Sequence, residues 1–271
     1  MRPHLANSRR LFATTFLAIG ALLFSVSLAH EQVVTLPNGQ QAVINWGIGE
    51  LKATGQAVAP TNATTAGQKQ LLARRGAVLD AQRNLLETLS GVYVAADSTM
   101  VNFMASDVVR TQVQGIVQGA TITFEGWDAA SEIYTVEMAI PLDSVRKLLD
   151  GTKVATTNTP TPQTPTGIVI NTRGLNIVPS LTFRIVTVSG VEVAGAAVGF
   201  YIAAATGSES AALEMATQDA RVTDDPFVVT AVNLLANRVD IVVTDADGEL
   251  LALFLTQRDF FGEGRTLVIV N

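Results

Sequence analysis

The sequence has no cysteine and only two histidines, His4 and His30, among its 271 residues. The absence of cysteine excludes disulfide bridges, thiolate catalysis, zinc-thiolate sites and the lipid-modified cysteine of a bacterial lipoprotein. His4 lies in a predicted signal peptide and His30 would be the new, mobile amino terminus after its removal, so we expect no histidine triad and no histidine metal centre. We therefore expect no enzymatic activity, no cofactor, no metal and no direct lipid anchor.

Positive charge is also scarce, since 18 Lys and Arg residues stand against 24 Asp and Glu residues. Three of the arginines precede an apolar run from Leu11 to Leu28, which ends in the small residues of a cleavage site. This pattern predicts a signal peptide over residues 1–29, and the alternative is a retained membrane anchor. Loss of the leader makes the chain still more acidic, so nucleic acid is a poor partner for it.

The chain after the leader divides into two parts at a segment of unusual composition. Residues 151–166 have no apolar period and hold three prolines among threonines, which is typical of a semi-extended linker. The fold class that we predict is α+β. It consists of one long helix packed on a mostly antiparallel sheet over residues 30–150, followed by a second, mixed α/β domain over residues 167–271.

The strongest pattern lies between Ala73 and Val94. Apolar pairs recur every seven residues there, which predicts one long amphipathic helix. Thr65 and Gln68 form a capping box at its start, and Gly91 supplies its stop. We expect the leucine stripe of this helix to pack on the sheet.

The opposite face of the same helix consists of small, uncharged side chains. We interpret it as an outer surface for contact with a partner. Its residues are Ala73, Ala77, Ala81, Asn84 and Thr88.

Two polar residues, Arg75 and Gln82, project from the middle of the leucine stripe. A buried arginine must be paired. We expect Arg75 either to extend to the rim of the domain or meet a carboxylate there, or to reach a partner subunit. The candidate carboxylates are Glu125, Asp128 and Glu137.

The remaining elements follow from alternation and from short apolar runs. We predict one strand over residues 43–58 with a bulge near Gly49. Further strands are predicted over residues 108–117, 120–124 and 132–140. The second part has short apolar runs over residues 167–171, 181–188, 191–202, 239–244 and 266–270. The last of these has no polar face, so we place it in the middle of a sheet. Helices are predicted over residues 209–218, behind a Ser208 cap, and over residues 227–236.

Two acidic motifs could have a function, and each also has a simpler structural explanation. Residues 245–249 begin like a calcium loop, but the twelfth position is Thr256 instead of glutamate, so we predict a turn. Asp224 and Asp225 could form a carboxylate pair, but before Pro226 they are better explained as a helix cap.

Several segments carry a family resemblance. In the first part, INWGIGELKATGQAV at residues 44–58, the helix at residues 73–94, and DVVRTQVQGIVQGATI at residues 107–122 resemble one bacterial domain. That domain is shared by the LPP-twenty lipoproteins and the N-terminal part of flagellar assembly protein T. Residues 166–181, 220–235 and 239–270 are similar to a C-terminal extension found in exported members of this group.

The resemblance implies a role in the cell envelope of a Gram-negative-type bacterium. Some members are lipidated into the outer membrane, and the flagellar relative contributes to a periplasmic ring around the motor. None is similar to a known enzyme. The lack of cysteine separates this chain from the lipidated members, and nothing in it points specifically to flagella.

Three hypotheses about function follow. The first is a non-enzymatic protein of the periplasm or outer-membrane periphery, acting through contacts with envelope proteins or with copies of itself as a structural or ring-assembly subunit. The second is a periplasmic small-ligand-binding module with a pocket between the two domains. The third is a glycosidase that relies on carboxylates, although no carboxylate pair is marked by the sequence.

Overall fold

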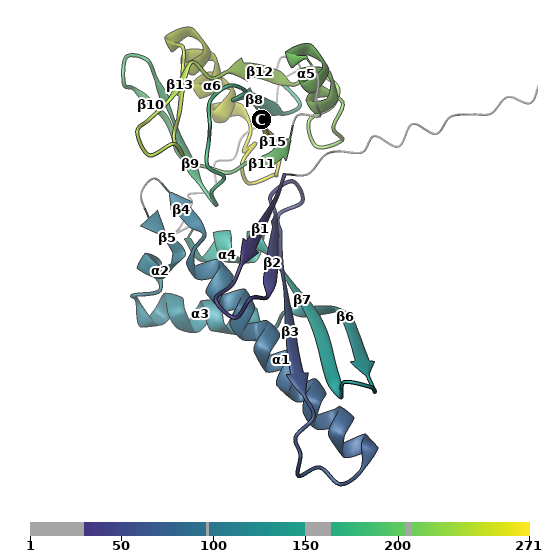
Figure 1. The fold of residues 1–271 in the computed structure, drawn as a ribbon. Helices are drawn as coiled ribbons and strands as arrows, with labels where there is room; N and C mark the ends of the chain where they lie inside the picture. Colours follow the sequence, from purple (N-terminus) through teal and green to yellow (C-terminus); the bar gives the residue numbers. More distant parts are fainter. Residues whose placement is uncertain (1–29, 96–97, 150–163, 204–207) are drawn as a thin grey trace, which may run out of the picture.

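A computed structural model of the chain describes residues 30–95, 98–149, 164–203 and 208–271 (Figure 1). The predicted leader lies outside the described residues, as does most of the predicted linker. We refer to residues 30–149 as the N-terminal region and to residues 164–271 as the C-terminal region. The α+β class is confirmed, with a long helix against an antiparallel sheet in the N-terminal region. Within the described residues, no helix has the length and apolar character needed to cross a membrane.

The N-terminal region is built on a five-stranded sheet in the order β1-β2-β3-β7-β6, antiparallel throughout. Along β7 buried side chains alternate with half-buried ones, which indicates that one face of the sheet is covered and the other is open. The strands are β1 (Glu31–Thr35), β2 (Gln41–Asn45), β3 (Glu50–Val58), β6 (Thr121–Asp128) and β7 (Ile133–Pro141).

The single strand predicted over residues 43–58 was wrong, because the structure has two strands there. Strands β2 and β3 pair as an antiparallel hairpin, and Asn45 lies opposite Glu50. Gly49 has a φ of 70°, a conformation that favours glycine. The change of phase in the apolar pattern therefore marks a turn and not a bulge.

Helix α1 (Ala66–Ser90) has the predicted ends. The Thr65 hydroxyl accepts a hydrogen bond from the Gln68 backbone N–H at 3.2 Å, which satisfies one of the free donors of the first turn. The Gln68 side chain accepts in return from the Thr64 backbone N–H, also at 3.2 Å. At the other end, the Gly91 N–H bonds to the carbonyl oxygen of Thr88.

The face that α1 presents to the sheet is the reverse of the predicted one. Leu71, Leu72 and Leu79 of the leucine stripe are 52%, 40% and 63% exposed. The small-residue face lies against the sheet, and its five residues are all at most 4% exposed: Ala73, Ala77, Ala81, Asn84 and Thr88. Of the stripe, only Leu85 and Leu89 near the end of the helix are fully buried.

Close backbone approach explains this orientation. A Cβ atom placed on Gly55 of β3 would lie 2.1 Å from the Ala81 nitrogen and 2.4 Å from the Ala77 oxygen. A Cβ atom on Gly76 would in turn lie 2.7 Å from the Ala57 Cβ. Leucine side chains cannot fit where a helix lies this close to a strand. Alanine and glycine can, so the small face is the packing face.

The rest of the N-terminal region packs beside the end of α1. The strand predicted over residues 108–117 was wrong, since α3 (Asp107–Gln118) is helical and buries Val113 and Val117, one turn apart. The short elements of this region are β4 (Tyr93–Ala95), β5 (Ser98–Thr99), α2 (Met100–Phe103) and α4 (Leu142–Leu149).

The C-terminal region contains two four-stranded sheets, in the orders β11-β15-β8-β12 and β10-β9-β14-β13. The first sheet is parallel throughout, and its strand β15 lies between two neighbours, as predicted. The strands are β8 (Ile168–Asn171), β9 (Phe183–Thr187), β10 (Glu192–Ala197), β11 (Phe200–Ala203), β12 (Phe227–Thr230), β13 (Asn233–Leu234), β14 (Ile241–Val243) and β15 (Thr266–Val270).

Helix α5 (Glu209–Thr217) begins behind the predicted Ser208 cap, whose hydroxyl accepts from the Ala211 backbone N–H. Two other predictions were wrong. Residues 227–236 contain strands β12 and β13, so Asp224 and Asp225 precede a strand instead of capping a helix. Residues 245–249 are the first turns of helix α6 (Asp245–Gln257), which Thr244 caps, instead of a turn after a strand.

Candidate functional site

The two regions meet at a cluster of aromatic side chains. Trp46, from the turn after β2, lies edge-on to Tyr201 of β11, with ring centroids 5.7 Å apart. Phe183 of β9 contacts the same tyrosine at 6.3 Å. All three rings are at most 1% exposed. Burial raises the pKa of the Tyr201 phenol, which therefore stays neutral, and its oxygen accepts a hydrogen bond from the Ser180 N–H.

Backbone hydrogen bonds continue the contact between the regions. The Tyr201 carbonyl accepts from the His30 N–H at 3.2 Å, and the His30 carbonyl accepts from the Trp46 N–H at 2.8 Å. On the other side of the joint, the N–H groups of Leu181 and Thr182 donate to Tyr93 and Val94. The two regions therefore share main-chain pairing as well as a core.

A buried arginine that the sequence did not single out stands at this joint. Arg146 of α4 is 3% exposed and donates to the carbonyl oxygens of Leu181 (3.2 Å) and Gly199 (3.4 Å). Its guanidinium lies 5.7 Å from the centre of the Phe200 ring, and that of Arg221 lies 4.7 Å from the same ring. Arg221 also donates to Gly47 of the N-terminal region at 2.7 Å. These contacts fill the joint with side chains and fix the two regions together.

The predicted partner face of α1 lies in the interior. Asn84 is 0% exposed there, and its amide is hydrogen-bonded to the sheet. It donates to the Thr54 carbonyl at 2.7 Å and to the Gln40 side chain. The Asp80 carboxylate accepts from the Gln56 N–H at 2.9 Å. Strand β2 pairs with β3 only as far as Ala53, and side chains of α1 bond two backbone groups of β3 beyond that point. The face predicted for a partner is thus occupied by the chain's own sheet.

The reversed orientation of α1 also determines where Arg75 and Gln82, the two polar residues of the leucine stripe, lie. Arg75 is exposed, and it is the neighbouring Arg74 whose Nε pairs with Glu125 at 2.7 Å. Gln82 is half-buried and reaches the Gln118 carbonyl of α3 at 3.5 Å. Arg75 was placed on a stripe that faces the sheet, and that placement was wrong because its side of the helix faces away from the sheet.

The side of α1 that remains open carries exposed leucines, with the exposed Arg75 among them. We define the outer leucine face as Leu71, Leu72 and Leu79. Toward the end of the helix it leads to a hollow of about 280 Å³ between α1 and helices α2 and α3. Val101 of α2 lines this hollow and is 54% exposed, and α2 and α3 carry two further exposed apolar side chains, Phe103 (37%) and Val108 (67%).

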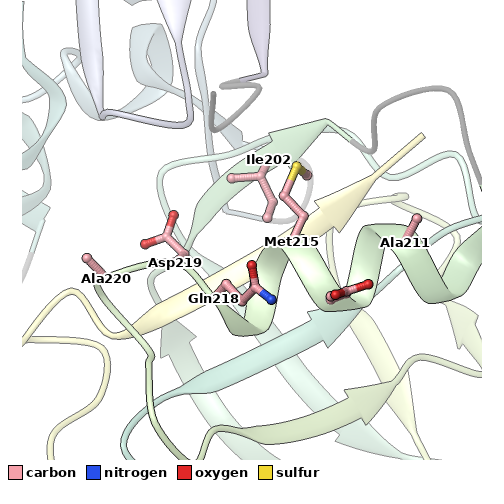
Figure 2. Close-up of a pocket in the computed structure, with 7 residues that line it drawn as sticks. Ile202, Ala211, Met215, Gln218, Asp219 and Ala220 are labelled. Carbon is pink, nitrogen blue, oxygen red and sulfur yellow. The ribbon is translucent and has the colours of Figure 1, made fainter. Parts of the chain in front are cut away.

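A hollow of about 530 Å³ lies in the C-terminal region, between α5 and the edge strand β11 (Figure 2). Met215 and Ile202 supply its apolar part, and Glu214 and Gln218 its polar part. Asp219 also lines it, but its carboxylate is held by Arg221 in two hydrogen bonds of 2.9 and 2.7 Å. This hollow offers one uncommitted carboxylate beside apolar walls.

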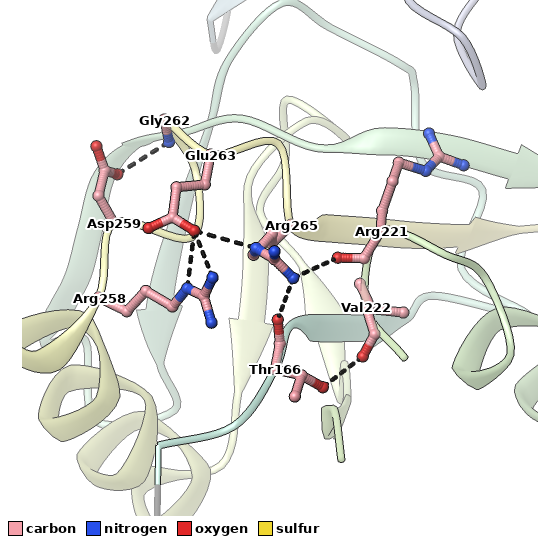
Figure 3. Close-up of polar contacts among 8 residues, drawn as sticks. All are labelled: Thr166, Arg221, Val222, Arg258, Asp259, Gly262, Glu263 and Arg265. Carbon is pink, nitrogen blue, oxygen red and sulfur yellow. Dashed lines mark hydrogen bonds and ion pairs between the residues drawn. The ribbon is translucent and has the colours of Figure 1, made fainter. Parts of the chain in front are cut away.

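A network of polar side chains connects the loops that precede the parallel strands β8 and β15 (Figure 3). The Glu263 carboxylate accepts from Arg258 at 2.6 and 2.8 Å and from Arg265 at 3.0 Å. Arg265 donates onward to the Thr166 carbonyl at 3.1 Å, next to the start of β8. The Thr166 hydroxyl bonds to Val222 and accepts from the Asp225 N–H. Every group has a structural partner, so the network orders the loops around the sheet.

Neither acidic motif of the sequence gathers a cluster of possible metal ligands. Within residues 30–95, 98–149, 164–203 and 208–271, no three His, Cys, Asp or Glu side chains lie close enough together to hold a metal ion. His30, the one histidine described, is half-buried at the joint, and burial lowers its pKa.

Comparison with known proteins gives a match for the C-terminal region. No curated protein matches the chain. Residues 167–271, less than half of the chain, are similar to a family described as the second domain of Treponema pallidum Tp0624.

Proposed function

We propose that this is a non-enzymatic protein of the bacterial cell envelope that acts through contacts with other proteins. The observation that carries the proposal is the outer leucine face of α1, three leucines between 40% and 63% exposed on one helix. Exposed apolar side chains that gather on one side of a helix favour an interaction site there. The resemblance to the LPP-twenty group and to flagellar assembly protein T supports a structural or ring-assembly subunit, built with envelope partners or copies of itself.

The place of action is part of the proposal. The apolar leader at residues 1–29 favours export, so we place the mature protein in the periplasm or at the periphery of the outer membrane. The acidic composition and the lack of cysteine favour attachment through protein contacts over attachment to anionic lipid.

Site-specific photocrosslinking in cells tests the proposal. A benzophenone side chain at position 79 should give crosslinked products, identified by mass spectrometry as an envelope protein or a second copy of the chain. The same group at position 48 is the control, because Ile48 is 61% exposed, close to the 63% of Leu79, but lies on a turn of the sheet.

Charge on the outer leucine face should abolish these products. We expect the double variant Leu72→Glu, Leu79→Glu to lose them while keeping its stability, and Ile48→Glu to keep both. A protein that forms no product from position 79, and that remains monomeric at all concentrations in ultracentrifugation, would contradict the proposal.

A second candidate function is binding of a small ligand, favoured by the hollow between α5 and β11. We expect such a ligand to carry a cationic or hydrogen-bonding group for Glu214 and an apolar body for Met215. Thermal shift against a panel of periplasmic amines and amino acids tests it, since a ligand raises the melting temperature with its excess over the dissociation constant. The variant Met215→Trp, which fills the hollow, should abolish any such shift.

A further inference from the structure

Strand β10 is an edge strand beside a helix. In the order β10-β9-β14-β13 it pairs only with β9 among the described residues. Figure 1 shows it at the margin of the C-terminal region, and α6 packs against it. The outer backbone groups of an edge strand can accept another strand.

A groove runs between this edge and α6. It consists of two hollows of about 250 and 270 Å³, and Val193 lines both. The residues from α6 fall on one side of that helix, since Asp245, Gly248, Ala252 and Leu255 are spaced by three or four. We call the two hollows together the β10–α6 groove.

Small residues line the middle of the groove. Strand β10 contributes Ala194, Gly195 and Ala196, and α6 contributes Gly248 and Ala252. Gly248 lets the helix come close to the sheet, because a Cβ atom there would lie 2.4 Å from the Thr187 side chain. Larger apolar side chains, Leu255 and Phe261, line only the second of the two hollows.

The two ends of the groove differ in charge. Glu192, Asp245 and Glu249 line one end without any basic residue, whereas the other end holds Asp259 and Arg258, which is paired with Glu263. In the described part of the chain, none of the three carboxylates at the first end belongs to an ion pair. Hydrogen bonds from Ser189, the backbone one at 3.1 Å, lower the pKa of Asp245 and keep it ionised.

We propose that the β10–α6 groove binds an extended segment of a partner protein, which adds a strand to β10 and places Lys or Arg side chains against Glu192, Asp245 and Glu249. Main-chain hydrogen bonds to β10 supply affinity, and the acidic end sets the direction of the segment. The inference rests on the proposed function only in taking the partner to be a protein, and it uses a surface separate from α1.

The irregular register of β10 limits how much backbone hydrogen bonding contributes to binding of the segment. Pairing with β9 shifts between Glu192 and Ala194 and again between Ala194 and Ala197. Bulges of this kind shorten the stretch that can pair regularly with a new strand. The segment therefore needs the charges and the small side chains as well, which makes the groove selective.

Defined peptides test the proposal. The probes are fluorescein-labelled octapeptides with alternating Ala and Val in the middle, carrying Lys-Lys at the amino end, Lys-Lys at the carboxyl end, or Glu-Glu in either place. Fluorescence anisotropy with the full chain should show one Lys-Lys order binding roughly tenfold or more tighter than the other three peptides. Methylation of alternate peptide nitrogens, which removes backbone donors, should weaken that binding.

Variants locate the binding. Ala252→Trp obstructs the groove, and Ala246→Trp is its control, since both residues are exposed on α6 and only Ala252 lines the groove. We expect Ala252→Trp and Glu249→Lys to abolish binding and Ala246→Trp to preserve it. The variant Leu72→Glu, Leu79→Glu should bind the peptide like the wild type, which separates this surface from the outer leucine face.

Three results would overturn the proposal. They are equal binding of all four peptides, binding that survives Ala252→Trp, and self-association of the wild type that Ala252→Trp abolishes, since the last would make a second copy the occupant. Each of these leaves the crosslinking result at position 79 standing, so the two proposals can fail independently.

Discussion

The two regions cover their sheets in different ways. In the C-terminal region, β8 and β15 are buried along their whole length, so their side chains are covered on both faces. In the N-terminal region one long helix covers one face of the sheet, and the other face remains open. The first arrangement encloses its apolar residues. The second leaves part of the apolar surface of its helix exposed to solvent.

This difference shows that the apolar content of a helix does not decide which side faces the core. Helix α1 has more leucine on its exposed side than on its packed side near Gly55, because the sheet accepts only small residues there. The outer leucines are therefore available for a partner, whereas the alanines stabilise the fold.

The largest expected effect comes from inserting a larger side chain between α1 and β3. Gly55→Leu should lower the free energy of unfolding by about 3 kcal/mol or more, because its side chain meets helix backbone. Urea denaturation measures it. Gly115→Ala is the control, since a Cβ there meets nothing within 4 Å, and it should be neutral or slightly stabilising. A tolerated Gly55→Leu would mean that helix and strand can separate freely.

Two leucines six residues apart on α1 test the orientation directly. Leu85 is 0% exposed and Leu79 is 63% exposed. Leu85→Ala should cost about 2.5 kcal/mol through the cavity it leaves, while Leu79→Ala should cost less than about 0.5 kcal/mol. Thermal and urea unfolding of both variants give the comparison. Equal losses would show that the leucine stripe is packed after all.

The joint between the regions should depend on Arg146. Arg146→Met leaves the carbonyls of Leu181 and Gly199 without this donor, so we expect a loss of about 2 kcal/mol. Arg83→Met, whose side chain is 75% exposed, should stay within about 0.5 kcal/mol of the wild type. Urea unfolding followed by Trp46 fluorescence, in a Trp127→Phe background, reports on the joint. An unchanged midpoint would mean that the other contacts of the joint hold the regions together without Arg146.

The smallest effect concerns pH. Burial lowers the pKa of His30 below its ordinary value of 6.5, so the unfolded chain binds the proton more readily than the folded one. The folded protein therefore has its full stability at pH values above the pKa that His30 has in the unfolded chain. Its free energy of unfolding declines as the pH falls below that value. Urea midpoints at about pH 7.5 and about pH 5.8 should differ in the wild type. His30→Gln should reduce that difference, and an unaltered difference would place the titrating group elsewhere.

Local signals in the sequence predicted much of the fold. The ends of α1, the Ser208 cap of α5 and the central place of β15 each depend on a few neighbouring residues. The α+β class followed from the order of these elements. Such features are set by capping hydrogen bonds and by uninterrupted apolar runs, which the sequence displays directly.

Features set by distant residues were not predictable in the same way. The valines of α3 favour a strand locally, and packing against the neighbouring helices made them helical. Asp224 and Asp225 resemble a cap, yet the following residues pair with β8. The packed face of α1 depends on Gly55, more than ten residues before the helix, and Arg146 became important only through contacts with the C-terminal region.

The alanines of α1 also have a consequence for how the helix finds its position. Ala73, Ala77 and Ala81 recur every four residues, so close packing against Gly55 alone would tolerate a helix displaced by about one turn. Asp80 and Asn84 break that degeneracy, because only one alignment brings them to the Gln56 N–H and the Thr54 carbonyl. Two polar side chains thus select one register from a repeating series, a task that the apolar contacts cannot perform.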